Sequence, residues 1–344
     1  MGRSLLILSL LVLASCGRPP AASEKLFVSN ERGDSVVALD PASGTVLQRI
    51  SPGRRPRGLL LSPDGATLYV AISGSPIGGP GVDESRLPPA DHRADGIAVI
   101  DVASGKVARV LPAGTDPETF ALSPDGRTLF VSNEDQGVVS AVAVDGGRAA
   151  ITTKVGNEPE GIAVTPDGAR LFVACEASDH VAMLDARTLK LIKTIAIEGR
   201  PRGLLMSADG ATVYASVESG GRLALISAGD GVVQKQIDLA QGDKSIKPMG
   251  MVEAPDGHVF VTTGRGGMVL EVDPMRGAIV RGIARVGARP WGIGITADRK
   301  TLLTANGPSN NVTFVDRVSG KIIRHVATGE GPWGIASRAG GGAQ

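Results

Sequence analysis

A Pro-x-Gly tripeptide recurs along the chain, and its middle residue changes in chemistry from copy to copy. The copies begin at Pro56, Pro117, Pro159, Pro201, Pro248, Pro290 and Pro332. Their middle residues are Arg57, Glu118, Glu160, Arg202, Met249, Trp291 and Trp333, and in the second copy Thr119 takes the place of Gly. Carboxylates and guanidinium groups bind polar partners, whereas indole rings bind flat apolar ones. If these side chains meet, they suit a ligand with an apolar plane and polar handles.

A second set of carboxylates occupies one fixed position in the same repeat. Its members are Glu31, Glu134, Glu176 and Glu218, each placed directly after an apolar run such as LFVSN. These glutamates are candidates for a shared site, although each could instead accept hydrogen bonds from backbone N–H groups of the neighbouring repeat. The two tryptophans could likewise pack as wedges between repeats. Acid–base chemistry by Glu118 and Glu160 stays open, because clustered carboxylates raise one another's pKa.

The spacing of the tripeptides predicts the elements that position these residues. The gaps are 61, 42, 42, 47, 42 and 42 residues, which defines a unit of about 42 residues with insertions of 19 and 5. Each unit holds four short apolar runs. Turn signals such as Ser-Pro-Asp-Gly at 62–65 and Asp-x-x-x-Gly at 101–105 separate the runs. Short β-branched runs between turns predict four strands per unit.

Four antiparallel strands repeated seven times predict an all-β, seven-bladed β-propeller over residues 25–338. The chain enters this region at KLFVSN, a second strand, and leaves it at PWGIAS, a first strand. We therefore expect the two ends to share one blade and to close the ring, which removes exposed sheet edges. Residues 339–344 are expected to form a flexible tail.

Strand alternation assigns the loops to two faces. The Pro-x-Gly tripeptides and the loops after each second strand share one face, while Asp64, Asp125 and Asp167 belong to turns on the opposite face and are expected to be structural. Both insertions, 73–95 and 239–247, fall on the Pro-x-Gly face. A loop as long as 73–95 is expected to be either a lid or unstructured. It carries His92, the one histidine expected near the candidate site, with a solvated side chain as the alternative.

The repeat resembles the YVTN-type propeller family. The matching tetrapeptide slot reads LFVSN at 26–30 and 129–133, LYVA at 68–71 and LFVAC at 171–175. More narrowly, RPRGLLLSPDG, EPEGIAVTPDG and the two PWGI copies resemble propellers associated with PQQ-dependent alcohol catabolism in bacteria. This resemblance implies a role beside a periplasmic dehydrogenase or its cytochrome.

The first residues resemble a bacterial lipoprotein signal. Arg3 precedes an apolar run that ends in Leu13-Ala14-Ser15-Cys16, which is similar to a lipobox. The resemblance implies a signal peptide over 1–15, lipidation of Cys16, a tether over 16–24 and a membrane anchor. Gly17 after the cysteine favours the periplasmic face of the outer membrane. An ordinary cleaved signal with an incidental cysteine is the alternative. Cys175 is expected to be a buried small residue.

Composition narrows the function further. With 36 Lys+Arg against 35 Asp+Glu, a general nucleic-acid binder is excluded. The four histidines lie singly in different repeats, and no haem-attachment motif or P-loop occurs, so no metal or cofactor is predicted.

The sequence favours a monomeric, non-catalytic binding lipoprotein for a small ligand or a partner protein. The alternatives are a propeller enzyme of lactonase or haem type, and a cell-surface structural or adhesion lipoprotein.

Overall fold

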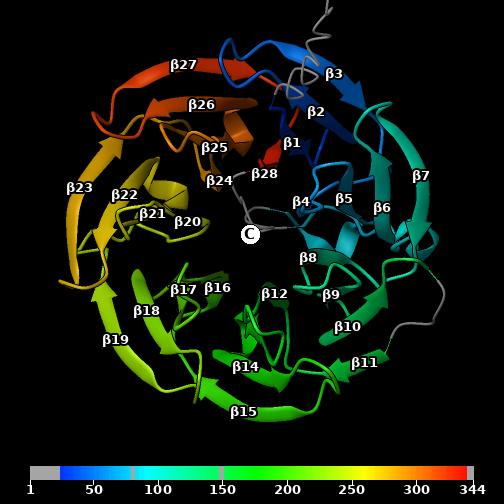
Figure 1. Ribbon diagram of the computed structural model, residues 1–344, viewed down its shortest axis with the longest axis horizontal. Helices are drawn as coiled ribbons and strands as arrows, with labels where there is room; N and C mark the ends of the chain where they lie inside the picture. Colours follow the sequence, from blue (N-terminus) through cyan, green and yellow to red (C-terminus); the bar gives the residue numbers. More distant parts are fainter. Residues whose placement is uncertain (1–23, 79–81, 147–150, 339–344) are drawn as a thin grey trace, which may run out of the picture.

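The computed structural model describes residues 24–78, 82–146 and 151–338. These residues form seven four-stranded antiparallel sheets arranged as blades around a central axis (Figure 1). The predicted seven-bladed β-propeller is therefore confirmed. The signal peptide, Cys16 and most of the tether, together with residues 339–344, lie outside the described residues.

Each blade runs from an inner strand at the axis to an outer strand at the rim. Blade 1 contains β4 (Leu59–Leu61), β5 (Thr67–Ile72), β6 (Gly96–Asp101) and β7 (Lys106–Leu111). Blade 2 contains β8 (Pro117–Leu122), β9 (Thr128–Asn133), β10 (Val138–Ala143) and β11 (Ile151–Lys154). Blade 3 contains β12 (Pro159–Val164), β13 (Arg170–Cys175), β14 (His180–Asp185) and β15 (Leu191–Ala196).

The remaining blades repeat this order. Blade 4 contains β16 (Pro201–Met206), β17 (Thr212–Val217), β18 (Arg222–Ser227) and β19 (Val233–Asp238). Blade 5 contains β20 (Met251–Glu253), β21 (Val259–Thr262), β22 (Met268–Asp273) and β23 (Ala278–Ala284). Blade 6 contains β24 (Pro290–Ile295), β25 (Thr301–Asn306), β26 (Asn311–Asp316) and β27 (Ile322–Ala327).

Blade 7 closes the ring with strands from both ends of the chain. Its order is β28 (Pro332–Ala336), β1 (Leu26–Asn30), β2 (Ser35–Leu39) and β3 (Val46–Ile50). The inner strand β28 pairs antiparallel with β1, and the register places Ala336 opposite Phe27 and Ile335 opposite Val28. The predicted sharing of one blade by the two ends is confirmed. In Figure 1 the red β28 lies directly beside the blue β1.

Apolar side chains fill the spaces between neighbouring blades. Ala336 and Phe27 of blade 7 pack with Leu59 and Leu68 of blade 1, and Ile335 packs with Leu303 of blade 6. The second and third strands are buried along most of their length, whereas the outer strands β3 and β7 are exposed along most of theirs. The core is therefore a ring of inter-blade layers, and the tail strand contributes to two of them.

Glycine after the variable residue lets the inner strands approach one another. A Cβ on Gly161 would lie 2.2 Å from the carbonyl oxygen of Arg202 in the next blade, and one on Gly292 would lie 2.4 Å from that of Trp333. Blade 2 is the exception, because the Thr119 hydroxyl donates a hydrogen bond of 2.6 Å to the carbonyl oxygen of Glu160. The departure from Pro-x-Gly therefore replaces a close approach with a hydrogen bond.

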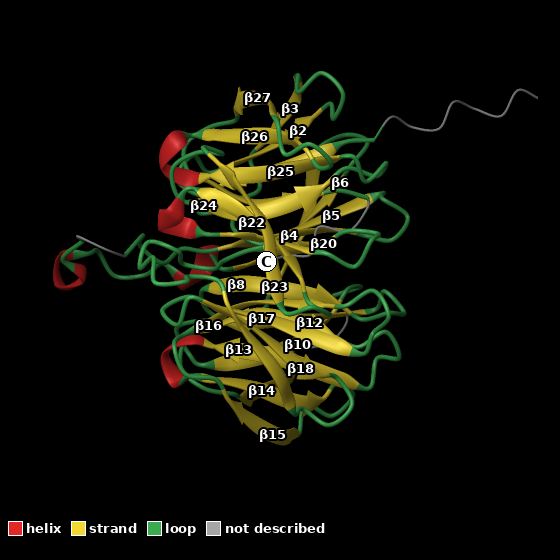
Figure 2. Cartoon of the chain, turned by 90° about the vertical axis from the view of Figure 1, so that its left-hand side faces the viewer, coloured by secondary structure: helices red, strands yellow, loops and turns green. Residues whose placement is uncertain are grey.

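The two faces differ as the sequence predicts. The aspartate turns are structural: the Asp64 carboxylate accepts hydrogen bonds from the Ser62 hydroxyl and from the Ala66 N–H. The Pro-x-Gly face carries all five 3₁₀ helices of the described residues, which lie in loops between second and third strands (Figure 2). They are η1 (Glu84–Arg86), η2 (His92–Ala94), η3 (Glu176–Ser178), η4 (Gly264–Gly266) and η5 (Gly307–Ser309).

Candidate functional site

A cavity of about 750 Å³ opens on the Pro-x-Gly face, and we call it the mouth. The predicted site residues that line it are Glu118, Glu134, Glu160, Glu176, Arg202, Glu218, Trp291 and Trp333. Part of the long insertion, including Pro76, Ile77 and Leu87, also lines the mouth, so its described part is ordered chain at this wall. These predicted site residues therefore line one cavity on one face of the propeller.

A break in strand pairing occurs at the variable residue in blades 2, 3, 4, 6 and 7. In blade 3 the pairing between β12 and β13 jumps from Pro159 to Ile162 and passes over Glu160 and Gly161. Blade 4 has the same break between Pro201 and Leu204. Bulges of this kind redirect a side chain away from the sheet surface. The rigid inner strands therefore present Glu160 and Arg202 to the mouth.

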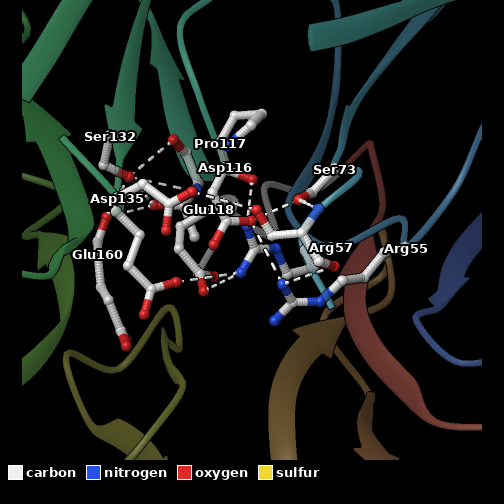
Figure 3. A network of polar contacts seen from close by, with 12 residues as sticks. Arg55, Arg57, Ser73, Asp116, Pro117, Glu118, Ser132, Asp135 and Glu160 are labelled. Carbon is white, nitrogen blue, oxygen red and sulfur yellow. Dashed lines mark hydrogen bonds and ion pairs between the residues drawn. The ribbon is translucent and has the colours of Figure 1, made fainter. Parts of the chain in front are cut away.

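Arg57 lies beneath the mouth rather than in its wall. Its side chain is fully buried and forms ion pairs with Asp116 and Glu118. Its Nη1 lies 3.3 Å from Oε2 of Glu134, and its Nη2 donates a hydrogen bond of 2.9 Å to the carbonyl oxygen of Pro117 (Figure 3). A single buried guanidinium therefore holds three carboxylates of blade 2 in place.

Arg202 holds a second group of three carboxylates. Its Nη2 lies 2.6 Å from Oε1 of Glu160, and its Nη1 lies 2.7 Å from Oε2 of Glu218 and 3.1 Å from Oε1 of Glu176. The candidate glutamates of blades 2 to 4 thus bind arginines. No backbone N–H of the described chain donates to Glu31, Glu134, Glu176 or Glu218, so the alternative backbone-binding role is wrong.

The residue before each proline was missed by the sequence reasoning. In the first six copies this position holds Arg55, Asp116, Glu158, Arg200, Lys247 and Arg289, and each of them lines the mouth. Five of these six have positive φ, between 46° and 65°. This left-handed backbone points the side chain into the cavity. The signal was present in the repeat, since a charged residue precedes the proline in six of the seven tripeptides.

Charges divide the mouth into two arcs. Ion pairs connect Arg55, Arg57, Arg200 and Arg202 with eight carboxylates, which belong to Glu31, Asp116, Glu118, Glu134, Glu158, Glu160, Glu176 and Glu218. We call this set the acidic arc, and eight carboxylates against four arginines leave an excess of four negative charges when all are ionised. Burial raises the pKa of Glu118 and Glu160 well above the ordinary range, although Arg57 and Arg202 oppose the shift.

The opposite side of the mouth, the basic arc, holds cations without ion-pair partners. Its members are Arg32, Lys247, Arg265 and Arg289, and the described residues place no carboxylate within ion-pair distance of any of them. Burial lowers the pKa of Arg289, and the nearby guanidinium groups of Arg202, Arg265 and Arg32 lower it further. The basic arc therefore provides uncompensated positive charge.

Trp291 lies against both arcs, since it contacts Arg202 of the acidic arc and Arg289 of the basic arc, and Trp333 packs beside it. Their ring centroids lie 6.2 Å apart at an interplanar angle of 34°, and the guanidinium of Arg289 stands 4.7 Å from the centroid of Trp291. Trp333 is buried and Trp291 is half-buried, and both line the mouth. They pack on each other as neighbouring blades require, and they also present aromatic surface to the cavity.

Two further predictions concern single residues. His92 does not line the mouth; its Nδ1 lies 2.8 Å from Oδ2 of Asp95, at the base of the insertion, and half of the histidine side chain is exposed. Cys175 is fully buried among apolar side chains, and burial raises its pKa to about 12. The expectation of a buried cysteine is confirmed.

The opposite face also has a cavity, which the sequence reasoning did not predict. It measures about 370 Å³ and is apolar, with Leu60, Leu122, Val164 and Met206 from blades 1 to 4 in its wall. It lies where inner strands end at the aspartate turns. No helix of the described chain is long and apolar enough to cross a membrane.

The fold and the mouth define a seven-bladed propeller with an aromatic cavity between an acidic and a basic arc. Residues 32–326 match the model of a family described as outer membrane protein assembly factor BamB, and the chain belongs to this family, PQQ_2. A curated relative, Antigen Lp49 of Leptospira interrogans, is 28% identical over 137 residues, which cover 31% of this chain. The match spans only 30% of that relative's length.

Solved structures share the architecture. The periplasmic gluconolactonase PpgL of Pseudomonas aeruginosa is 23% identical, with a TM-score of 0.72 and coverage of 91% of this chain and 98% of that one. A putative 6-phosphogluconolactonase of Bacteroides fragilis is 16% identical, with a TM-score of 0.72 and coverage of 93% and 99%. Hydrazine synthase of Kuenenia stuttgartiensis is 20% identical, with a TM-score of 0.68 and coverage of 87% and 93%. At these identities the likeness shows the fold alone.

Proposed function

We propose that this protein is a non-catalytic binding propeller whose mouth holds a small ligand with a carboxylate group and a flat apolar face. One observation carries the proposal: the two adjacent tryptophans lie beside Arg289, which has no ion-pair partner among the described residues. A guanidinium over an indole ring is a ready site for an anion whose ring packs on the remaining aromatic surface.

The surroundings of Arg289 support an anionic ligand. Arg202, Arg265 and Arg32 add positive charge to that of Arg289, so the free protein keeps like charges close together in a partly buried place. An anion relieves this repulsion and gains charge-assisted hydrogen bonds. A cavity of about 750 Å³ is within the size of small-molecule sites.

Tryptophan fluorescence tests the proposal, because both tryptophans of the sequence line the mouth. We propose titrating the protein at low salt with gluconate, benzoate and PQQ as carboxylate probes. Saturable quenching by at least one probe is expected, with affinity at least about tenfold weaker in Arg289→Ala, since a hydrogen bond to a charged group contributes about 1.5–3 kcal/mol. Arg187→Ala, an exposed arginine on the opposite face, is the matched control.

The titration can show that the proposed ligand site is wrong. If none of the three probes gives a saturable change, or if Arg289→Ala binds as tightly as the wild type, the ligand site is wrong. Incubation with gluconolactone tests the non-catalytic part of the proposal. Hydrolysis above the uncatalysed rate that is lost in Arg289→Ala would make the protein an enzyme of the lactonase type instead.

We further propose the cellular setting that the sequence resemblance implies. A lipid at Cys16 would hold the protein at the periplasmic face of the outer membrane, near a PQQ-dependent alcohol dehydrogenase or its cytochrome. Glu24 accepts a hydrogen bond of 2.9 Å from the N–H of Ala297, and Lys25 donates one of 3.3 Å to the carbonyl oxygen of Val102, both on the aspartate-turn face. An anchor there would turn the mouth away from the membrane.

Two measurements test this setting. Globomycin treatment and mass spectrometry of the amino terminus report lipidation of Cys16, and an unmodified cysteine in the mature protein would overturn the anchor. Co-purification from the native host reports the partner. We expect a dehydrogenase or cytochrome that is lost with Trp291→Ala plus Trp333→Ala, and a partner retained by that double variant would not use the mouth.

A further inference from the structure

The acidic arc contains three carboxylates that converge on one point. One oxygen from each of Glu118, Glu134 and Glu160 lies within 4.8 Å of the corresponding oxygens of the other two. Glu118 and Glu160 project from neighbouring inner strands, β8 and β12, and Glu134 follows β9. Figure 3 shows Glu118 beside Arg57 with Glu160 of the next blade on its other side. Rigid strands of two blades thus bring the three groups together.

The arginines use only one oxygen of each carboxylate. Arg57 contacts Oε1 of Glu118 and Oε2 of Glu134, and Arg202 contacts Oε1 of Glu160. Two guanidinium groups therefore orient the three carboxylates through one oxygen of each.

The strongest single observation is the second oxygen of Glu118. Oε2 is buried and has no partner among the described residues, and the glutamate as a whole is 6% exposed. Leaving a buried acceptor unpaired costs about 1–3 kcal/mol, so most buried acceptors in native proteins have a hydrogen-bond partner or a bound ion. The unpaired oxygen belongs to one of the three clustered carboxylates, and a cation bound by the cluster would supply the missing partner.

We propose that Glu118, Glu134 and Glu160 bind a divalent cation, and that Ca²⁺ is the ion that fits the site best. Carboxylate oxygens are the ligands of hard cations. Ca²⁺ binds six to eight oxygens in a flexible geometry, whereas Mg²⁺ demands a near-ideal octahedron. Ca²⁺ also accepts an irregular ligand set completed by water.

Charge supports the same assignment. The acidic arc has an excess of four negative charges when its eight carboxylates are ionised, so a divalent cation reduces the excess by half. The excess is local, because the compensating Arg289, Arg265 and Lys247 belong to blades 5 and 6. The cation site is separate from the anion site proposed above, and either can exist without the other.

Terbium luminescence gives a direct test of the cation site. Tb³⁺ replaces Ca²⁺ in oxygen sites, and indole excitation sensitises its emission at short range; Glu160, Trp291 and Trp333 line a common pocket below the mouth. We expect the full-length protein, freed of metal with EDTA, to show saturable Tb³⁺ emission that Ca²⁺ displaces at lower concentration than Mg²⁺. Calorimetry with CaCl₂ should give one ion per chain. Binding of Ca²⁺ should raise the melting temperature.

Glu134→Gln is the decisive variant, because Glu134 is 28% exposed and its amide isostere fits the same space. We expect Ca²⁺ affinity at least about tenfold weaker, with the metal-free melting temperature retained. Glu160→Gln should weaken binding in the same way. Glu253→Gln, whose carboxylate accepts from the N–H of Ala208 on the opposite face, is the matched control and should bind as the wild type does.

Other outcomes overturn the proposal. No saturable Ca²⁺ or Tb³⁺ binding at millimolar concentration would leave a shared proton among the carboxylates as the explanation of the unpaired oxygen. Equal Ca²⁺ affinity in Glu134→Gln would place the ion elsewhere. Neither result bears on the anion site, because quenching by carboxylate probes depends on Arg289 and needs no divalent cation. Failure of the cation-site proposal can therefore be distinguished from failure of the anion-site proposal.

Discussion

The guanidinium carbon of Arg202 lies 4.9 Å from the centroid of the Trp291 ring. The same guanidinium forms ion pairs with Glu160 and Glu218, so one side chain joins the acidic arc to the aromatic wall. A cation over an indole contributes about 0.5–2 kcal/mol, depending on solvent exposure. Because Arg202 touches both sides, a change of charge in the acidic arc alters the surface on which a ligand packs.

The first prediction concerns the buried guanidinium of Arg57. Arg57→Met leaves Asp116, Glu118 and Glu134 without their common cation in a buried place, so we expect the free energy of unfolding to fall by about 3–5 kcal/mol. Urea unfolding in the presence of EDTA measures the change. The double variant Arg57→Met/Glu118→Gln should lose less than the sum of the single losses, by about 1 kcal/mol or more, because the two side chains interact directly.

The neighbouring Arg54 provides the control for this cycle. Its side chain is 58% exposed and lies 3.8 Å from Asp91, so Arg54→Met should change the free energy of unfolding by less than about 0.5 kcal/mol. If Arg57→Met is as stable as the wild type, the carboxylates do not need the guanidinium and the ion-pair network is wrong. Strict additivity in the double variant would contradict the direct Arg57–Glu118 contact.

The second prediction concerns the close approach of inner strands at Gly161. A Cβ there meets the backbone oxygen of Arg202 at 2.2 Å, and backbone on a rigid inner strand yields little. We expect Gly161→Ala to lower the free energy of unfolding by about 1–3 kcal/mol, as overpacking does. In Gly229→Ala the added Cβ meets nothing nearer than 3.9 Å, so this control should be close to neutral. Equal effects in the two variants would show that the approach is not tight.

Blade count and face assignment could be predicted because they depend on local signals. Pro, Asp and Gly fix the turns within a few residues of each other, and antiparallel alternation then assigns every loop to a face. Trp291 and Trp333 could be placed side by side because they occupy the same position in successive repeats. The sharing of one blade by the two ends of the chain followed from counting the strands in each repeat. These inferences require no knowledge of side-chain geometry.

The burial of each side chain and its ion-pair partners could not be predicted from the repeat. Arg57 and Arg202 occupy one repeat position, yet Arg57 is fully buried and Arg202 lines the mouth. The charged residues before each proline, such as Arg200, point into the cavity through a left-handed backbone that no residue type other than glycine signals reliably. The apolar cavity on the opposite face depends on how far apart the inner strands end.

The third prediction is a pH dependence at the base of the insertion. The hydrogen bond to Asp95 raises the pKa of His92, and the more distant carboxylates of Asp135 and Asp116 act in the same direction. Because the folded-state pKa is above that of the unfolded chain, this contact stabilises the fold fully at low pH. Its contribution is lost as the pH rises through the folded-state pKa of His92. The magnitude is small, since half of the histidine side chain is exposed.

Nuclear magnetic resonance of the four histidines measures this pKa directly. We expect His92 to titrate above its ordinary value in the wild type and to return toward that value in Asp95→Asn. Asp83→Asn, which removes a carboxylate that pairs with Arg86 in the same insertion, should leave the titration unchanged. A His92 pKa that is the same in all three proteins would mean that the contact does not form in solution.

The fourth prediction concerns closure of the ring by β28. Deleting residues from Gly331 onward removes the partner of β1 and takes Trp333, Ile335 and Ala336 out of the inter-blade layers. The two large side chains alone contribute about 3–6 kcal/mol through burial, which is comparable to the whole stability of many domains. The deletion also exposes an unpaired edge of β1, which invites association between chains. We therefore expect loss of the cooperative thermal transition and concentration-dependent aggregation, measured by circular dichroism and light scattering.

A chain that ends at Arg338 keeps β28 and should melt as the full-length protein does. If the deletion from Gly331 still melts cooperatively near the wild-type temperature, then pairing between β28 and β1 does not hold the propeller together.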